Sequence, residues 1–242
     1  MSRVGDRARL EARIAKKSFR TASGQSAPVL ADLSFALEEG ETGALIGPSG
    51  CGKSTMMRIL AGLDRDFEGS VQIPAHGRVG MVFQEPRLLP WRCLEDNVRL
   101  AAPDASEAEI AALFDALGLS EHRTHFPGEL SVGLARRAAL ARAFAVRPTL
   151  LLLDEPFVSL DAPLARQLQR DLARLVESRC MITVLVTHDV DEAIALADRI
   201  FVLSPRPAHV KGEIRVKNPR AAMSAEESRA VATRIEALRG AG

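Results

Sequence analysis

Residues 47–55 read GPSGCGKST, and this stretch decides the fold. It matches G-x-x-x-x-G-K-[ST], a pattern whose glycines let the backbone curl until consecutive N–H groups point inward at phosphate oxygens. A short apolar strand pattern at residues 42–46 comes directly before it, and a helical pattern of apolar residues follows at 56–60. The positive N-terminal end of such a helix favours bound anions. A strand, a glycine loop and a helix in this order predict a phosphate-binding α/β unit.

Side chains in this loop supply the groups that a nucleotide requires. Lys53 is predicted to place its ammonium between the β- and γ-phosphates of ATP, and the Ser54 hydroxyl to ligate Mg²⁺. Cys51 has two interpretations: a small thiol tolerated for packing, which we favour, or a thiol whose pKa falls in electropositive surroundings, so that alkylation inactivates the protein and ATP protects it. The candidate nucleotide-binding residues of the loop are Gly47, Pro48, Ser49, Gly50, Cys51, Gly52, Lys53, Ser54 and Thr55.

A second motif, LLLLDEP at residues 150–156, places two carboxylates after a strand. Four consecutive leucines suit a parallel strand that is buried on both faces. Its carboxyl end, where open α/β sheets bind ligands, carries Asp154 and Glu155. We expect Asp154 to coordinate Mg²⁺ directly or through another ligand, and Glu155 to polarise the water that attacks the γ-phosphate.

Polar residues also end two further predicted strands. Gln84 ends VGMVFQ, and its side-chain carbonyl suits Mg²⁺ or a water bound to it; the alternative is a surface amide. His188 follows the strand pattern MITVLVT and precedes Asp189. A lone histidine at a strand end is usually structural. Three polar positions at the ends of three strands beside one phosphate loop favour a catalytic site instead.

Composition narrows the classes of function. The 242 residues carry a formal net charge of +1, which gives no electrostatic footprint of a general nucleic-acid binder. No stretch approaches the ~20 apolar residues of a bilayer-spanning helix, and the N-terminus has no apolar signal core. Three cysteines without a CxxC pair fit a reducing compartment. We therefore expect a cytosolic chain that reaches any membrane through a partner.

The periodicity of the remaining chain indicates where the sheet is interrupted. Residues 10–14 and 33–37 alternate between apolar and polar, as half-buried strands do, whereas the chain beyond Gln84 turns helical. We predict a single domain over residues 1–242, with a parallel α/β core and a mainly helical subdomain inserted at residues 87–147.

Three helices are predicted in the rest of the chain, two of them from capping residues. Asp104 is the expected N-cap of a helix that stops at Gly118, and a second helix covers about residues 131–146. Ser224 and Glu227 have the spacing of a capping box before a C-terminal helix.

Six motifs in a fixed order make residues 10–216 resemble the ATP-binding subunit of the ABC transporter superfamily. They are GPSGCGKST, Gln84, LSVGLARR (130–137), LLLLDEP, SLD (159–161) and VTHDVDEA (186–193). The resemblance implies a P-loop NTPase core and an ATPase that uses ATP and Mg²⁺, with Lys53, Glu155 and His188 as catalytic residues. It also implies that Phe19 stacks on the adenine; the alternative is an aromatic of a core strand.

The resemblance further implies a mechanism that one chain cannot complete. Two copies would sandwich two ATPs, each bound by the phosphate loop of one copy and the signature LSVGL of the other. Ser131 and Gly133 stand where the family's signature contacts the γ-phosphate. This requires them to lie at a helix N-terminus, where free N–H groups favour anions. Asp161 would communicate across the dimer interface.

The signature departs from the family's usual L-S-G-G-Q at two positions. Val132 adds a β-branched side chain where glycine allows close backbone approach, and Leu134 replaces an amide with an apolar group. Two interpretations remain open: a tolerated family variant, which we favour because Ser131 and Gly133 are kept, or a slow or asymmetric composite site.

The segment MVFQEPRLLPW (81–91) looks like the corresponding stretch of the nitrate, sulfonate and taurine importer ATPases. By resemblance, Arg87, Leu88, Leu89 and Trp91 would dock on a transmembrane permease. The chain would then power import of a small solute from a solute-binding protein, at the cytoplasmic face of the plasma membrane and without nucleic acid. It ends soon after its last predicted helix, so we expect no regulatory domain. The alternatives are an ABC ATPase of a lipid-handling or non-transport complex, and a different P-loop enzyme such as a small-molecule kinase.

Overall fold

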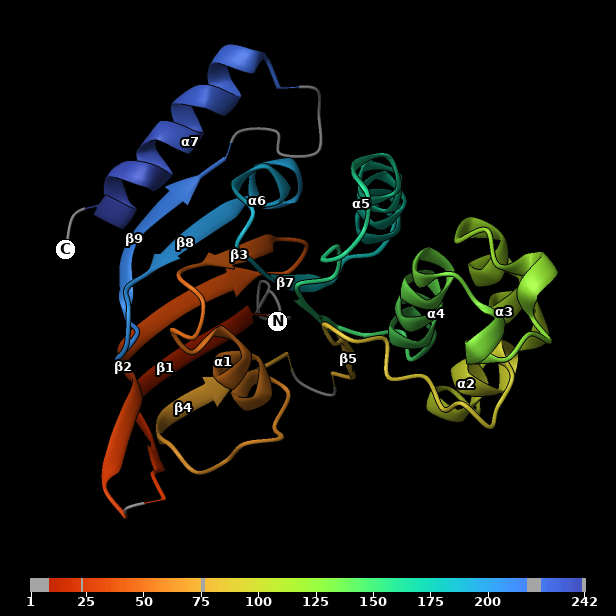
Figure 1. The fold of residues 1–242 in the computed structure, drawn as a ribbon, viewed down its shortest axis with the longest axis horizontal. Helices are drawn as coiled ribbons and strands as arrows, with labels where there is room; N and C mark the ends of the chain where they lie inside the picture. Colours follow the sequence, from red (N-terminus) through yellow and green to blue (C-terminus); the bar gives the residue numbers. More distant parts are fainter. Residues whose placement is uncertain (1–8, 23, 75–76, 217–222, 241–242) are drawn as a thin grey trace, which may run out of the picture.

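The computed structural model describes residues 9–22, 24–74, 77–216 and 223–240, which form two sheets and the helices around them (Figure 1). The strands are β1 (Arg9–Arg20), β2 (Ser26–Glu38), β3 (Thr42–Ile46), β4 (Glu68–Gln72), β5 (Val79–Val82), β6 (Leu150–Asp154), β7 (Ile182–Thr187), β8 (Arg199–Leu203) and β9 (Val210–Arg215). The helices are α1 (Lys53–Leu60), α2 (Leu94–Ala101), α3 (Glu107–Ala116), α4 (Val132–Ala145), α5 (Ala162–Glu177), α6 (Val190–Leu196) and α7 (Ala225–Gly240), with 3₁₀ turns η1 (Ser120–His122) and η2 (Pro127–Glu129).

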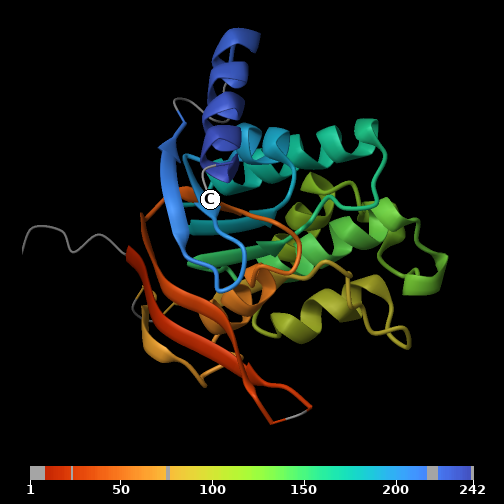
Figure 2. The ribbon, with the colours of Figure 1, turned by 60° about the vertical axis from the view of Figure 1, so that its left-hand side comes forward.

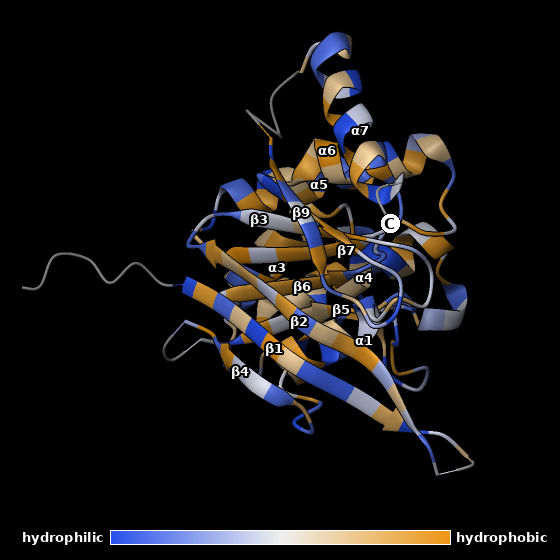
Figure 3. Ribbon diagram, turned by 90° about the vertical axis from the view of Figure 1, so that its left-hand side faces the viewer, coloured by the Kyte–Doolittle hydropathy of each residue, from blue (hydrophilic) through white to orange (hydrophobic). Residues whose placement is uncertain are grey.

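The larger sheet has six strands in the order β5-β6-β7-β3-β8-β9. The pairs from β5 to β8 are parallel, and β9 adds an antiparallel edge. Every residue of β3, β6 and β7 is buried, as the run of leucines in β6 predicted, and β6 and β7 are coloured hydrophobic in Figure 3. Because these strands are parallel and adjacent, their carboxyl ends meet at one edge of the sheet.

The smaller sheet is antiparallel, in the order β2-β1-β4. The predicted alternation in its two long strands is confirmed, since Leu10, Ala12 and Ile14 are buried opposite Leu37, Phe35 and Leu33. Figure 2 shows this pair of strands, in red, extending past the six-stranded core. Its buried face packs on the side of the core that carries α1.

Helices occupy the chain between β5 and β6. They are α2, α3 and α4, and they lie together on one side of the six-stranded sheet (Figure 1). The prediction that Asp104 caps the first long helix here is wrong. Ser106 is the N-cap of α3, because its hydroxyl accepts from the Glu109 N–H while the Glu109 carboxylate accepts from the Ser106 N–H. This reciprocal pair satisfies two helix-end donors, which a carboxylate two residues earlier does not. Gly118, with φ +63°, follows the end of α3 as predicted.

The C-terminal helix α7 covers α6 and β9, at the opposite side of the molecule from α2–α4 (Figure 1). The predicted capping box is confirmed: Ser224 N donates to the Glu227 carboxylate at 3.0 Å, and Glu227 N donates to Ser224 Oγ at 3.2 Å. Ile235 is fully buried and anchors the helix to the core. Among the described residues, none of the helices has the length and apolar character needed to cross a bilayer.

Candidate functional site

The glycine loop follows β3 and ends where α1 begins. Gly50 and Gly52 have φ of +76° and +130°, a region that favours glycine, and a Cβ on Gly52 would lie 2.8 Å from Leu30 Cδ2. Inside the curl, Lys53 is 6% exposed, and its Nζ donates to the carbonyl oxygens of Gly47 at 2.8 Å and Pro48 at 3.0 Å. A buried ammonium whose hydrogen bonds go to neutral carbonyl oxygens retains an affinity for anions. The loop therefore fits the terminal phosphates of a nucleotide.

Asp154 brings a second oxygen ligand to the same place. It ends β6 almost fully buried, and burial raises the pKa of its carboxyl, opposed by a hydrogen bond with Ser54 and by the charge of Lys53. A carboxylate and a hydroxyl beside a phosphate-binding loop are the hard oxygen donors that Mg²⁺ takes together with substrate phosphates. No cluster of three His, Cys, Asp or Glu side chains with a geometry that could hold a metal ion occurs in the described part of the chain.

Glu155 and His188 face each other across the ends of β6 and β7. Glu155 Oε2 lies 3.4 Å from His188 Nδ1, and Glu155 N donates to Val186 O at 2.9 Å. Glu155 has φ +46°, a left-handed conformation that costs a non-glycine residue roughly 1–3 kcal/mol and is typical of active sites. The two side chains line a cavity of about 540 Å³ together with Ser159 and Thr187. The two side chains are near neighbours, and their roles as a base and the group that orients it stay a prediction.

Gln84 lies outside the strand that it was predicted to end. Strand β5 stops at Val82, because the next two carbonyls, those of Phe83 and Gln84, accept hydrogen bonds from Arg136 instead of a neighbouring strand. The Gln84 side chain is exposed. The structure therefore places Gln84 on the loop that leaves the sheet, and its contact with Mg²⁺ stays a prediction.

The signature lies at the N-terminus of α4, as its predicted role requires. Ser131 is the N-cap and its Oγ accepts from Leu134 N at 3.3 Å. Gly133 is buried, and a Cβ there would lie 2.6 Å from Leu164 Cδ2 in α5, so a larger residue would require the Leu164 side chain to move. Val132 is 57% exposed, and its side chain takes no part in the Ser131 cap or in the packing at Gly133. Leu164 also donates its N–H to Asp161, the N-cap of α5, so the signature and the SLD segment lie against each other.

Phe19 lies near the end of β1 and is 43% exposed. Lys17 Nζ lies 4.7 Å from the centre of its ring and forms a salt bridge of 2.9 Å with Asp64, just beyond α1. Lys17 is 2% exposed, so the Lys17–Asp64 salt bridge is buried on the lysine side. It connects β1 to the segment just after the helix of the phosphate loop. An accessible aromatic fixed relative to that helix suits stacking, and its contact with adenine stays a prediction.

Comparison with known proteins places these features in one family. The family model described as ABC transporter matches residues 30–158. The aliphatic sulfonates import ATP-binding protein SsuB 2 of Burkholderia cenocepacia (strain HI2424) is 43% identical over 215 residues, covering 86% of this chain and 78% of the relative. The chain belongs to the ABC transporter ATP-binding family. A protein of the same name from Pseudomonas syringae pv. tomato is 43% identical over 208 residues, covering 86% and 87% of the two chains.

Solved ABC cassettes confirm the fold. The dimeric bacterial ABC transporter cassette MJ0796 has a TM-score of 0.76 at 27% identity, covering 86% of this chain and 99% of that one. The same cassette in a dimeric post-hydrolysis state bound to ADP and Pi has a TM-score of 0.73. The P-loop NTPase core predicted from GPSGCGKST is therefore confirmed, and this ABC chain is an ATPase.

Buried cations outside the phosphate loop, which include Lys17 and Arg136, were not identified from the sequence. Lys17 pairs with residues almost fifty positions away, and Arg136 bonds carbonyls of two distant loops. The only signal was local: Arg136 stands among small apolar residues on a helix that must be buried, where an arginine requires a specific partner. The identity of that partner depends on tertiary contacts, which the local sequence does not reveal.

Cys51 is a packing residue, and the prediction of a lowered thiol pKa is wrong. The residue is 2% exposed, and burial raises the pKa of its thiol more than the nearby charge of Lys53 lowers it. Gly47 lies against it, since a Cβ on that glycine would be 3.0 Å from Cys51 Sγ. Desolvation thus outweighs the electropositive surroundings.

This burial predicts the order of cysteine alkylation. Iodoacetamide at mildly alkaline pH should modify the exposed Cys180 at least about tenfold faster than Cys51, because the buried thiol is both shielded and protonated. Peptide mass spectrometry over a time course measures both sites, with Cys180→Ser as the control for the fast site. Rapid labelling of Cys51 that ATP slows would contradict this account.

Proposed function

We propose that this chain is the ATP-hydrolysing subunit of an importer for aliphatic sulfonates or a similar small anionic solute. The observation that carries the proposal is the Glu155–His188 pair at the sheet edge that also presents Lys53, Ser54 and Asp154. The solute class is supported by the names of the relatives, which are aliphatic sulfonates import ATP-binding proteins. The match to this chain covers most of the length of each relative. None of the residues described above is proposed to touch the solute.

Each side chain of the site has a separate part in hydrolysis. Lys53 leaves the carbonyls of Gly47 and Pro48 to bind the β- and γ-phosphates. Ser54, Asp154 and Gln84 hold Mg²⁺, which when bound neutralises charge that develops on the phosphate oxygens. Glu155 orients the attacking water and accepts its proton, while His188, in contact with Glu155, holds that carboxylate in place. Phe19 carries the adenine by stacking.

A second copy of the chain completes the site. We propose that Ser131 and the N–H groups at the start of α4 bind the γ-phosphate held by the partner's phosphate loop, since a helix N-terminus favours anions. Gly133 lets α4 pack closely on α5, so that Asp161 moves with the signature. The dimeric cassettes that share this fold support a homodimer with two such composite sites.

The helical segment at residues 87–147 is the proposed contact with membrane subunits. Trp91 is 70% exposed, and it follows the exposed Arg87 on the loop between β5 and α2. Leu88 and Leu89 on the same loop are half-buried, and Leu88 packs against the core. An exposed tryptophan near an exposed arginine suits docking to a transmembrane permease, which would receive solute from a solute-binding protein. The chain would then sit at the cytoplasmic face of the plasma membrane and be held there by the permease. Lipid-handling and non-transport ABC complexes are the alternatives, and the importer names of the relatives favour transport of a solute.

Glu155→Gln tests the catalytic assignment. The variant should bind Mg·ATP with an affinity within about threefold of the wild type, because the amide keeps the shape of the side chain. Turnover should fall by a factor of roughly 10²–10⁴, because the amide cannot accept a proton. Titration calorimetry and phosphate release measure the two quantities, with Glu121→Gln on the distant η1 turn as the matched control. Hydrolysis at the wild-type rate would overturn the role of Glu155.

Val132→Gly tests the altered signature. Since the Val132 side chain is exposed while Ser131 and Gly133 keep their positions, the substitution should leave kcat within about threefold of the wild type. Steady-state ATPase assays measure this, and Leu100→Gly at another exposed position in a helix serves as control for helix destabilisation. A rise in kcat of about tenfold or more would show that Val132 hinders closure and that the composite site is slow.

A further inference from the structure

Arg136 occupies a junction between three segments of the site. It lies on α4, five residues after Ser131, and is 5% exposed. Its Nη1 donates to the carbonyl oxygens of Phe83, at 3.5 Å, and Gln84, and its Nη2 donates to Val158 O at 3.2 Å. One planar guanidinium therefore bonds the signature helix to the loop after β5 and to the turn after β6.

The two bonded segments are those on which hydrolysis depends. Gln84 begins the loop that runs to the docking residues, and Val158 belongs to the turn that carries Glu155. Val158 N donates to Glu155 O at 3.3 Å, so two hydrogen bonds, one from the guanidinium to Val158 O and one along the backbone, connect Arg136 with the catalytic residue. A shift of Glu155 on the change from ATP to ADP and phosphate would reach Gln84 through a single side chain.

The bonds of Arg136 are costly to break. Burial lowers the pKa of its guanidinium, Nε has no hydrogen-bond partner in the structure, and the nearby Glu85 offers only a longer-range attraction. The cation is thus satisfied mainly by three backbone carbonyls. Hydrogen bonds to a charged group are stronger than those between neutral groups, and a buried charge that loses them is strongly destabilised. One guanidinium therefore holds these three carbonyls in a fixed arrangement.

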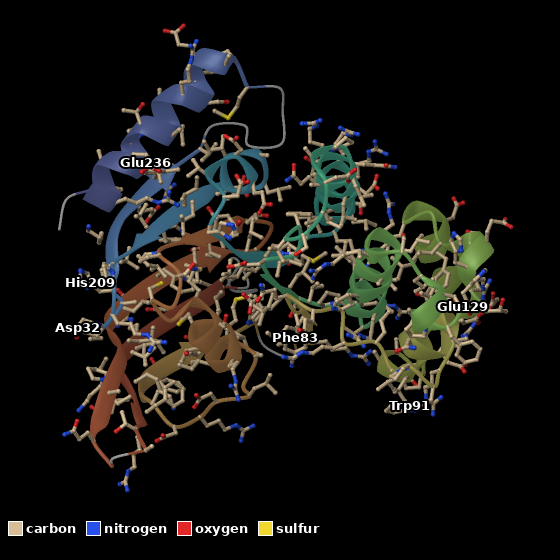
Figure 4. The ribbon with its side chains drawn as sticks, viewed as in Figure 1. Asp32, Phe83, Trp91, Glu129, His209 and Glu236 are labelled. Atoms are coloured by element: carbon tan, nitrogen blue, oxygen red, sulfur yellow. The ribbon has the colours of Figure 1, made fainter. Side chains whose placement is uncertain are left out.

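The rest of the loop is held in the same way as far as the docking residues. Arg142, also on α4, donates to the carbonyl oxygens of Pro86 and Arg87, both at 2.7 Å. The buried amide of Asn97 on α2 bonds Leu89 and the carbonyl of Arg92. Figure 4 shows Phe83 between the sheet and the helices, and Trp91 farther out on the same loop. We call the loop from Gln84 to Trp91 the strap. Arg136 binds its inner end, and Trp91 lies at its outer end.

We propose that Arg136 is a positioning residue that links Glu155 to the loop from Gln84 to Trp91, so that the nucleotide state of the ATP site is transmitted to the permease-docking surface. This inference rests on the proposed function and adds the residue that connects its two ends. Lysine cannot replace Arg136, because one ammonium cannot reach two opposed sets of carbonyls in the fixed geometry of a guanidinium fork.

The sole tryptophan of the chain reports on the outer end of the strap. In full-length protein carrying Glu155→Gln to prevent turnover, Trp91 emission should change as Mg·ATP binds. Adding Arg136→Lys or Arg136→Gln should reduce that change by about half or more, with the affinity for a fluorescent ATP analogue kept within about threefold. Two substitutions are used so that a folding defect in one leaves the other to decide.

Arg137→Lys is the matched control, because Arg137 is a buried arginine on the same helix that bonds Leu117 O and Asp171 rather than the strap. It should keep the full Trp91 response. An equal loss in Arg137→Lys, a full response in both Arg136 variants, or a parent protein that binds ATP without any Trp91 response would each overturn the inference while leaving the ATPase assignment intact. A parent protein that fails to bind ATP would overturn the proposed function itself.

Discussion

A buried ammonium is the interaction on which the rest of the site depends. Lys53 lies inside the glycine loop, where the carbonyls of Gly47 and Pro48 offset part of the cost of removing its charge from water. The carboxylates of Asp154 and Glu155 are close enough to interact with one another, and they stand at the end of a buried strand. The proposed function adds a polyphosphate and Mg²⁺ to this arrangement.

The parallel sheet explains why these groups meet. Buried strands β3, β6 and β7 are adjacent, so the glycine loop, the carboxylates and His188 leave the sheet at one edge. The helices between β5 and β6 add a second level of organisation, because the arginines of α4 bind loop carbonyls in place of strand partners. The signature helix is in this way joined to both the turn after β6 and the exposed loop, and the proposed coupling to a membrane partner uses this connection.

Most of the fold and the core of the site follow from local sequence. The glycine pattern, the leucine run of β6 and the alternation in β1 and β2 each report on one element and its burial, which short-range chemistry determines. The first cap of the helical segment was misplaced because Asp104 and Ser106 both suit an N-cap, and only the reciprocal bond with Glu109 decides between them. The pKa of the Cys51 thiol could not be predicted, because burial sets its direction. The partners of Arg136 could not be predicted either, because one of them, Gln84, lies more than fifty positions away in the sequence.

Closure of two copies around the nucleotide is the central claim, and sedimentation velocity tests it most directly. With Mg·ATP present, full-length protein carrying Glu155→Gln should sediment as a dimer. With Mg·ADP, or when Ser131→Glu places a carboxylate at the start of α4 facing the phosphates, it should sediment as a monomer. A species that stays monomeric while saturated with Mg·ATP would contradict the account.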